Sequence, residues 1–518
     1  MPTLEWIGKS KVINHHLDVP YRVLEEKYTY NAEKSGNMII HGDNLESLKS
    51  LLPEFEGRVK CIYIDPPYNT GNEGWVYNDN VNDPKIRKWL GEVVGKEGED
   101  LSRHDKWLCM MYPRLKLLHK LLSEDGVIFI SIDDTEFPYL RLICDEIFRN
   151  FVEAIVWQKR TSPDARKKLS SGHEYILIYT KNADANLGLK LLPLEGDDAA
   201  AYTNPDNDPR GPWISSPFTA PGYRPNQMYQ IITPAGKTMS PPRGRCWCNV
   251  EDVYKRLLAE GRMWFGADGN GVPRRKTYLS EREGRGTWTW WTNAEVGYTQ
   301  IATQELAAIL GKAVFDYPKP VRLISRVLRL ASSDGDIILD SFAGSGTTAH
   351  AVLNMNKADG GHRRFILVEM MDYAESITAE RVRRVIRGYG EGKNAVEGTG
   401  GDFSYYELGE TLLLPDGNLN EEVGADKIRA YIWYTETGEP MQEAETENPY
   451  YLGTSRDTAY YFYYERDRRT TLNYDFLETV TPDAEGYLIY ADVCTIPEEV
   501  LKKYNIVFKK IPRDIVRV

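Results

Sequence analysis

The chain has 518 residues, of which 42% are hydrophobic and 27% are charged, as is typical of a globular protein with two to four domains and a large core. No apolar run approaches the roughly 18 residues of a membrane span, the N-terminus does not resemble a signal peptide, and the six cysteines are too scattered for a zinc site, so we expect a cytoplasmic protein without membrane contact or metal. The net charge of −12 excludes a uniformly basic surface, but residues 209–290 hold 13 Lys and Arg against 6 Asp and Glu and can present a positive groove to nucleic acid.

The first part of the chain predicts alternating strands and helices. Residues 38–40 form a short apolar strand, and an amphipathic helix with leucines at 45, 48, 51 and 52 follows. Asp43 and Asn44 stand between the two, where either can cap the helix. The β-rich run 59–64 predicts a buried strand, so Asp65 falls where a strand ends and a loop begins. Ligands bind at this edge of an open α/β sheet.

Residues 107–179 continue the alternation. Helices are predicted at 107–122 and 136–149, and strands at 126–132, 154–157 and 174–179. Strands that alternate with helices favour a mostly parallel sheet.

The pattern changes between residue 182 and about residue 313, where proline, glycine and aromatic residues recur with little periodicity. Six of the twelve tryptophans lie here, and we expect most of them to be core residues of an irregular, β-rich domain. Arginines interleaved with these aromatics can bind phosphates and stack on bases. The candidate DNA-binding residues are Arg243, Arg245, Arg274, Arg275 and Lys276.

The alternation then resumes with a helix at 321–331 and a strand at 336–340. The strand runs into the glycine loop Ser341-Phe342-Ala343-Gly344-Ser345-Gly346, and after a short helix a second strand, 365–368, ends in Glu369. Glycines let the backbone approach a ligand, helix N–H groups face a carboxylate or phosphate, and an acid after the second strand can bind ribose hydroxyls. This unit predicts a nucleotide-type cofactor, and the same residues also fit NAD.

An acidic, tyrosine-rich segment, residues 401–518, follows a glycine-rich linker and holds 12 Lys and Arg against 23 Asp and Glu. Strand-like runs at 428–434, 459–464 and 486–491 predict a third, small α/β or β-rich domain. The segment contains no catalytic pattern that we can identify.

Asp65-Pro66-Pro67-Tyr68 is the strongest candidate for a catalytic stretch. Two prolines stiffen the loop and remove two N–H donors, which leaves bare carbonyl groups. A carboxylate, an exposed carbonyl and an aromatic ring can grip a flat group that bears an NH2, because Asp65 and Pro66 can each accept one N–H and Tyr68 can stack on the ring. The alternative is a plain strand-ending turn, in which Asp, Pro and Tyr are ordinary residues.

The longer stretch Asp65-Pro66-Pro67-Tyr68-Asn69-Thr70-Gly71 resembles the catalytic motif of amino-group DNA methyltransferases, and in particular the modification (Mod) subunits of type III restriction–modification systems. The order of motifs resembles their β class: Gly42-Asp43, the Asp65 stretch, a basic variable region, then the glycine loop. His173-Glu174 and Pro241-Pro242-Arg243-Gly244-Arg245 are also similar to Mod-type sequences. The resemblance covers about residues 37–388 and, more weakly, the C-terminal segment.

This resemblance implies an α/β fold, namely a Rossmann-like, circularly permuted sheet that binds S-adenosylmethionine, with an inserted target-recognition domain and a small C-terminal domain. The expected boundaries are 1–182 and 314–400 for the two parts of the methyltransferase domain, 183–313 for target recognition and 401–518 for the C-terminal domain. The implied catalytic residues are Asp65, Pro66, Pro67 and Tyr68. The implied cofactor-binding residues are Asp43, Asn44, Lys319, Asp340, Phe342, Gly344, Gly346, Thr347, Thr348 and Glu369.

The implied activity is methyl transfer from S-adenosylmethionine to the N6 amine of an adenine flipped out of double-stranded DNA. A homodimer and a separate helicase–nuclease restriction subunit are the implied protein partners. Methylation of cytosine N4 is the alternative chemistry. Two other classes remain open: an NAD-dependent oxidoreductase, which would leave the Asp65 stretch unused, and a non-catalytic DNA-binding subunit, which would predict degraded motifs.

Overall fold

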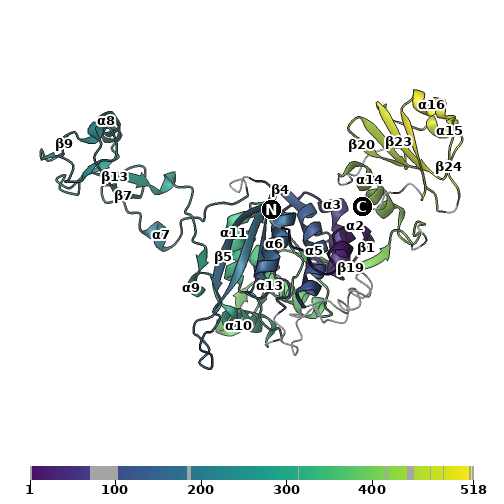
Figure 1. Ribbon diagram of the computed structural model, residues 1–518, viewed down its shortest axis with the longest axis horizontal. Coiled ribbons are helices and arrows are strands. Elements are labelled where there is room, and N and C mark those ends of the chain that lie inside the picture. The colour runs from purple at the N-terminus through teal and green to yellow at the C-terminus, as the bar shows by residue number, and fades with distance from the viewer. Residues whose placement is uncertain are drawn as a thin grey trace. The chain divides into compact units, whose positions relative to one another are not determined.

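The chain divides into two compact units in the computed structural model (Figure 1): Met1–Lys190 together with Thr289–Val518, and Leu191–Trp288. Among the described residues, no helix is both long enough and apolar enough to cross a membrane. The structure describes residues 3–69, 103–183, 188–312, 314–414, 416, 418–439, 441, 448–466, 468–481, 483–512 and 515.

The larger unit is built on one mixed sheet, which has ten strands among the described residues. Their order across the sheet is β1-β19-β2-β16-β15-β3-β4-β6-β5-β14. The bounds are Arg22–Tyr30 for β1, Met38–His41 for β2, Val59–Ile64 for β3, Leu122–Ile132 for β4, Asn150–Gln158 for β5, His173–Thr180 for β6, Trp290–Trp291 for β14, Ile337–Asp340 for β15, Arg364–Glu369 for β16 and Phe403–Thr411 for β19.

The centre of this sheet is parallel. Strands β2, β16, β15, β3 and β4 run in one direction, and β6 runs antiparallel to both of its neighbours, β4 and β5. Counted from β15, the strands follow the 3-2-1-4-5 order of an open doubly wound sheet, with β16 and β2 on one side and β3 and β4 on the other. In the chain, however, β15 comes after β3 and β4. The sheet is therefore Rossmann-like and circularly permuted, which confirms the expected fold class.

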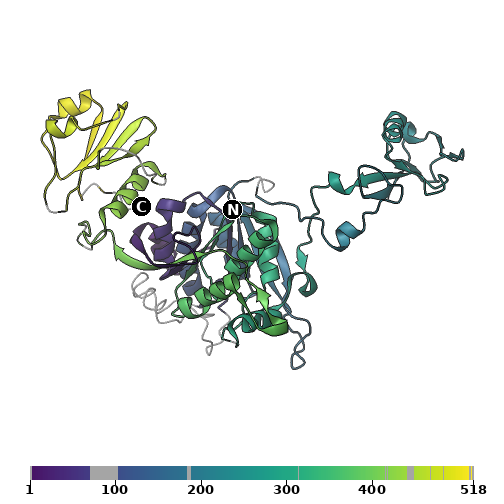
Figure 2. The ribbon, with the colours of Figure 1, turned by 180° about the vertical axis from the view of Figure 1, so that it is seen from behind.

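Helices cover both faces of the sheet. Figure 1 shows α5 and α6 in front of the strands, and Figure 2, seen from behind, shows the green helices of residues 321–387 on the other face. All residues of β3 are buried between the two layers, because a parallel strand covered on both faces must be apolar throughout. The bounds are Asn44–Phe55 for α3, Arg103–Leu121 for α5, Phe137–Ile147 for α6, Val321–Ala331 for α11, Thr347–Asp359 for α12 and Glu380–Arg387 for α13.

The smaller unit, Leu191–Trp288, is irregular and rich in short strands. Its core is aromatic and includes Phe218, Trp247 and Tyr254. Most of the tryptophans between residues 182 and 313 are buried or partly buried, as expected, and the exceptions are Trp288 and Trp290, which are 81% and 49% exposed. The bounds are Trp213–Pro217 for β7, Thr219–Pro221 for β8, Ile231–Ile232 for β9, Thr238–Met239 for β10, Arg245–Trp247 for β11, Glu251–Ala259 for α8, Met263–Trp264 for β12 and Arg274–Tyr278 for β13.

This unit is shorter than the expected segment 183–313. After Trp288 the chain returns to the large sheet, where β14 pairs in parallel with β5. Helices α9 (Asn293–Val296) and α10 (Thr299–Leu310) follow β14. Residues from Thr289 onward therefore belong to the larger unit.

The C-terminal segment starts inside the large sheet, because β19 pairs with β1 and β2. The predicted strand at 428–434 is wrong, since these residues lie in helix α14 (Ala425–Thr437). Ile428, Tyr431 and Ile432 are buried there at helical spacing, which outweighs their β-rich composition. The other two runs are confirmed as strands β21 (Thr458–Phe462) and β23 (Gly486–Ala491), which form a sheet with β20 (Tyr451–Ser455) and β25 (Ile506–Lys510).

Candidate active site

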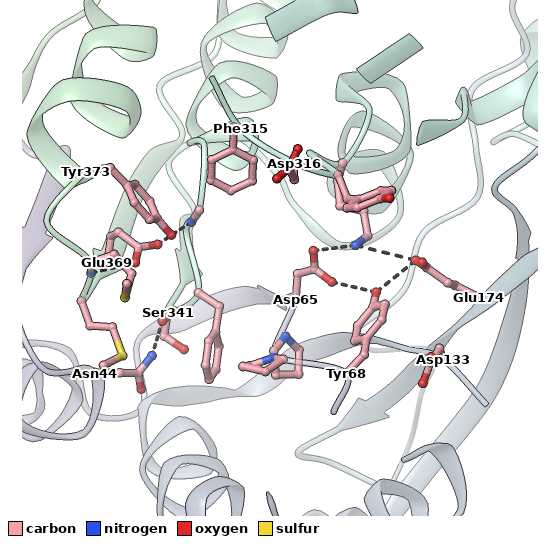
Figure 3. Close-up of a pocket in the computed structure, with 18 of the residues that line it drawn as sticks. Asn44, Asp65, Tyr68, Asp133, Glu174, Phe315, Asp316, Ser341, Glu369 and Tyr373 are labelled. Atoms are coloured by element: carbon pink, nitrogen blue, oxygen red, sulfur yellow. Dashed lines mark hydrogen bonds and ion pairs between the residues drawn. The ribbon is translucent and has the colours of Figure 1, made fainter. Parts of the chain in front are cut away.

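A cavity of about 340 Å³ opens at the edge of the sheet where β15 and β3 lie side by side. Asp65 directly follows β3, Asp340 ends β15 and Glu369 ends β16, so acids from three strands meet at the edge where open α/β sheets bind ligands. The volume is within the range of small-molecule sites. Figure 3 shows side chains that line the cavity. They include Asn44, Asp65, Pro66, Pro67, Tyr68, Asp133, Lys159, Glu174, Phe315, Lys319, Ser341, Phe342, Gly344, Glu369 and Tyr373.

Both carboxylate oxygens of Asp65 accept a hydrogen bond within the protein. Oδ1 accepts from the Tyr68 hydroxyl at 2.8 Å, and Oδ2 accepts from the Lys319 ammonium at 2.5 Å. Burial raises the pKa of Asp65, and the charge of Lys319 opposes that rise only in part. The carboxyl group is thus held at the strand end with an increased affinity for a proton.

Glu174 lines this cavity, although the sequence analysis assigned it no role. Its Oε2 lies 3.0 Å from the Tyr68 hydroxyl and 3.7 Å from the Lys319 ammonium, and its Oε1 lies 2.9 Å from the Lys159 ammonium. Burial raises the pKa of Glu174, but Lys319 and Lys159 together bring it below the ordinary value. Glu174 is therefore an ionised carboxylate that connects Tyr68 with two lysines. Figure 3 shows its side chain directed toward Tyr68.

The direction of β6 explains how Glu174 reaches the cavity. The ligand-binding edge is formed by the carboxyl ends of the parallel strands, but β6 is antiparallel to β4 and presents its first residues there. The signal in the sequence was the acidic residue of His173-Glu174, immediately at the start of a predicted strand. Whether Glu174 reaches the cavity depends on the direction of β6, which the hydrophobic pattern of the sequence does not specify.

The Tyr68 hydroxyl contacts two carboxylates, and the Tyr68 ring contacts a lysine. Burial and the charges of Asp65 and Glu174 raise the pKa of its hydroxyl well above the usual value, so Tyr68 is neutral. The Lys319 ammonium lies 5.0 Å from the centre of its ring, a separation at which a cation is attracted to an aromatic face.

Neighbouring residues anchor the loop that carries Tyr68. The Pro67 carbonyl accepts from the Trp107 indole at 2.6 Å, and the Asn69 amide donates to Glu136 at 2.5 Å. Thr70 and Gly71, the last residues of the motif, lie outside the described residues.

The glycine loop forms another wall of the cavity. Gly344 and Gly346 have φ values of 51° and 79°, which glycine adopts without strain. A Cβ atom at Gly344 would lie 3.0 Å from the Phe315 ring. The Gly344 N–H donates to Glu369 Oε2 at 2.7 Å, and burial raises the pKa of Glu369 to about 7.

Five of the ten expected cofactor residues line the cavity, and the other five lie outside its lining. Asn44, Lys319, Phe342, Gly344 and Glu369 line it. The others are not lining residues. Asp43 caps α3, and Gly346 precedes α12. Asp340 accepts from the Thr348 hydroxyl at 2.5 Å and from the Phe342 N–H at 3.1 Å, and the Thr347 hydroxyl donates to the Lys319 carbonyl at 3.2 Å.

Arg381 lies in the layer behind the glycine loop and is fully buried. Its guanidinium donates to the hydroxyls of Ser345 and Thr347, both at 2.8 Å. Arg381 belongs to the arginine-rich helix α13, in which charge alone would suggest a surface role. Its bonds instead hold the loop and the first turn of α12 together.

The expected DNA-binding residues of the smaller unit fall into two groups. The side chains of Arg243 and Arg275 are exposed. Arg245 donates hydrogen bonds to Thr219, and Arg274 donates hydrogen bonds to Ser215. Lys276 is 4% exposed, and its ammonium is paired with Asp206 and Asp208. The exposed arginines are therefore the members of this set whose guanidinium groups remain available to a phosphate.

The fold and the cavity together define a Rossmann-like protein in which a cofactor-type glycine loop and an Asp-Pro-Pro-Tyr stretch meet in one pocket. The DNA methylase family of N6 and N4 methyltransferases matches residues 59–380, and the chain belongs to this family. Membership in this family decides against the NAD-dependent oxidoreductase.

Relatives of this family cover most of the chain. The Mod subunit of the type III restriction–modification enzyme StyLTI from Salmonella typhimurium is 37% identical over 372 residues, which is 68% of this chain and 54% of that protein. The EcoP15I Mod subunit from Escherichia coli is 31% identical over 422 residues, 71% of this chain and 64% of its own length. The type II methyltransferase M.KpnI from Klebsiella pneumoniae is 33% identical over 365 residues, 65% of this chain and 81% of its own length. The chain thus spans less than two thirds of either Mod subunit.

Proposed function

We propose that this chain is a site-specific DNA methyltransferase that transfers a methyl group from S-adenosylmethionine to the N6 amine of an adenine flipped out of double-stranded DNA. The observation that carries the proposal is the single cavity shared by Asp65 and the glycine loop. Methyl transfer requires the donor and the acceptor to be held against each other in one place. Membership in a family of N6 and N4 methyltransferases supports the same reaction class.

The glycine-loop side of the cavity fits S-adenosylmethionine. Asn44 Oδ1 and Ser341 Oγ are buried there and lack a hydrogen-bond partner among the described residues, although buried polar atoms are normally paired. These atoms can bind polar groups of the cofactor, Glu369 can accept from its ribose hydroxyls, and the Phe315 ring provides an apolar surface. When bound, the cofactor supplies a methyl group on a positively charged sulfur.

The other side of the cavity fits the amine. The amine of adenine is a weak nucleophile because its lone pair is delocalised into the ring. Hydrogen bonds from the amine to Asp65 and to the Pro66 carbonyl would keep that lone pair on the nitrogen. Asp65 already accepts from Tyr68 and Lys319, but each carboxylate oxygen has a second lone pair. The ring of Tyr68 offers a face on which the extruded base can stack.

We assign sequence recognition to the unit Leu191–Trp288. Its exposed arginines include Arg243 and Arg275, which are suited to contact DNA. Exchange of this unit with that of a related enzyme should change the methylated motif. Retention of the original motif would place recognition elsewhere.

The protein partners in this proposal are a second copy of the chain and a restriction subunit with helicase and nuclease activities. The support is the similarity to Mod subunits of type III restriction–modification enzymes. Light scattering at micromolar concentration tests the homodimer. A monomer with full activity would remove the dimer from the proposal and leave the methyltransferase in place.

Methylation-aware sequencing of DNA from a host that expresses the protein tests the proposal, with Asp65→Ala as the matched variant. We expect N6-methyladenine at one motif with the natural protein and a loss of several orders of magnitude with Asp65→Ala. The affinities for cofactor and DNA should change little, as for an interaction made mainly in the transition state. N4-methylcytosine would support the alternative chemistry, and no modified base from a folded protein would reject the proposal.

A further inference from the structure

A second groove, of about 970 Å³, adjoins the active-site cavity. The two share the lining residues Lys159, Arg160, Phe315, Asp316 and Tyr317, so the groove leads directly to the cavity mouth. It belongs to the larger unit and not to the unit to which we assign sequence recognition.

One wall of this groove is the loop that connects β5 with β6, and the other wall includes the first turn of α10. Strand β5 runs parallel to β4 and β3, because β6 is antiparallel to both β4 and β5. The loop after β5 therefore leaves the sheet at the same edge as Asp65. The topology thus places a wall of the groove beside the proposed methyl-acceptor site.

The loop is strongly basic. Arg160 lines the groove, and Lys167 and Lys168 follow it on the same loop outside the lining. All three side chains are exposed, and among the described residues none of the three forms an ion pair with an acidic side chain. Asp164 in the same loop is already paired with Arg166 at 3.0 Å. On a chain whose net charge is −12, such a concentration of unpaired cations attracts anions locally.

We propose that this groove binds the phosphate backbone of the DNA strand that carries the target base. The inference rests on the proposed function, since an extruded base stays attached to its own backbone, which must then lie at the mouth of the cavity. Lysine and arginine side chains with hydroxyl and amide groups are the usual ligands of phosphate and sugar oxygens. The groove offers that set: Arg160, Thr161, Ser162, Thr299, Gln300 and Thr303.

The assignment divides DNA binding between two surfaces. Backbone contacts fix the position of a protein on DNA but carry no sequence information, whereas contacts with base edges do. The groove should therefore hold the target nucleotide in place with equal strength on any sequence. The unit Leu191–Trp288 should determine which sequence is chosen.

The first experiment is a salt titration of DNA binding with the variant Arg160→Ala/Lys167→Ala/Lys168→Ala. Each lost phosphate contact should make the slope of log K against log [salt] shallower by about 0.9. Affinity should fall equally for duplexes with and without the recognition motif. The matched control is Lys393→Ala/Lys502→Ala/Lys503→Ala, which removes three exposed cations that belong neither to the groove nor to the loop between β5 and β6 and should leave the slope nearly unchanged.

The second experiment locates the contact on the DNA. Neutral methylphosphonates replace the phosphates on either side of the target base in a synthetic duplex. This change should weaken binding of the natural protein and have almost no further effect on the triple variant, because contacting groups are not additive. Lys167→Glu/Lys168→Glu serves as a second variant. It should lose more DNA affinity than Lys167→Ala/Lys168→Ala, because it replaces two positive charges by negative ones.

The outcomes separate the groove from the proposed function. If the natural protein neither binds nor methylates DNA, the proposed function fails. If it does both, but the triple variant keeps its salt slope or shows full sensitivity to the methylphosphonates, the groove inference alone is overturned. The far-ultraviolet circular dichroism spectrum and the midpoint of urea unfolding should be the same in all variants, which shows that each is folded.

Discussion

The hydroxyl of Tyr68 lies 3.0 Å from Glu174 Oε2 while it also lies 2.8 Å from a carboxylate oxygen of Asp65. A hydroxyl has one proton, so it can donate to only one of the two carboxylates at a time. When a target amine donates to Asp65, the hydroxyl can turn its proton to Glu174 without losing its hydrogen bond. In the proposed reaction, Glu174 would thus be a positioning residue that allows Asp65 to release one acceptor oxygen for the substrate.

Glu174→Met should therefore lower kcat for methyl transfer and leave KM for the cofactor almost unchanged. A hydroxyl without its alternative acceptor costs about 1–3 kcal/mol, which corresponds to a roughly 5- to 150-fold loss. Glu174→Gln retains an acceptor oxygen and should recover much of the rate. Rapid-quench measurement of one turnover provides the test, and equal rates for the Met variant and the natural protein would exclude this role.

Substitutions of Tyr68 should separate its ring from its hydroxyl. Tyr68→Phe keeps the stacking face, so a 2-aminopurine at the target position should still brighten when the protein binds. Tyr68→Ala removes the face, which is worth roughly 1–3 kcal/mol per base, and should alter that fluorescence. We expect a smaller loss of rate in either variant than in Asp65→Ala. An identical fluorescence response in the Ala variant would argue against stacking on Tyr68.

Glu369→Ala should weaken binding of S-adenosylmethionine in calorimetry. A hydrogen bond to a charged group contributes about 1.5–3 kcal/mol, so the expected loss is roughly 10- to 150-fold. Glu369 also accepts from the backbone N–H groups of Gly344 and Met371, and Glu369→Gln is the control because it preserves an acceptor for the glycine loop. Unchanged affinity in a folded Ala variant would remove Glu369 from the cofactor site.

Asp340 should make the stability of the protein depend on pH. Burial raises the pKa of Asp340 to about 7, although Thr348 and the Phe342 N–H donate to it. Between the ordinary carboxyl pKa and about 7, the folded state binds a proton that the unfolded chain releases. The stability due to this group is complete below the unfolded pKa and is lost as the pH rises through about 7.

Asp340→Asn should flatten that dependence. Urea unfolding at several pH values between 5 and 8 gives the free energy of unfolding at each pH. The test is the difference between the variant and the natural protein in the slope of that free energy against pH. Glu369, whose pKa burial also raises to about 7, is present in both proteins, so the difference reports Asp340 together with its electrostatic coupling to Glu369. Parallel slopes would show that Asp340 does not titrate in this range.

The sequence alone determined the elements whose residues carry a local signal. The apolar run 59–64 predicted strand β3 and therefore the strand-end position of Asp65, because a strand buried on both faces is apolar throughout. The glycine loop was equally visible, since two of its residues adopt backbone angles that favour glycine. The circular permutation was implied only by the resemblance of the motif order to β-class amino methyltransferases.

Local signals failed where composition and spacing disagreed. Residues 428–434 are rich in aromatic and β-branched side chains, yet they form part of α14 because their buried positions recur at helical spacing. Lys276 belongs to a basic sequence, yet its ammonium is buried against Asp206 and Asp208, which lie about 70 residues earlier in the chain. A count of charges does not show which of them are neutralised by distant partners.

Only the tertiary structure decided which side chains contact one another in the candidate active site. Lys319 reaches Asp65 across 254 residues of sequence, and Glu174 reaches Tyr68 across 106. Neither contact can be recognised from the local sequence, because strand order and strand direction result from the packing of the whole sheet. The reversal of β6 places Glu174 at the same edge as Asp65, and the adjacency of β15 and β3 joins the glycine loop to the Asp65 stretch.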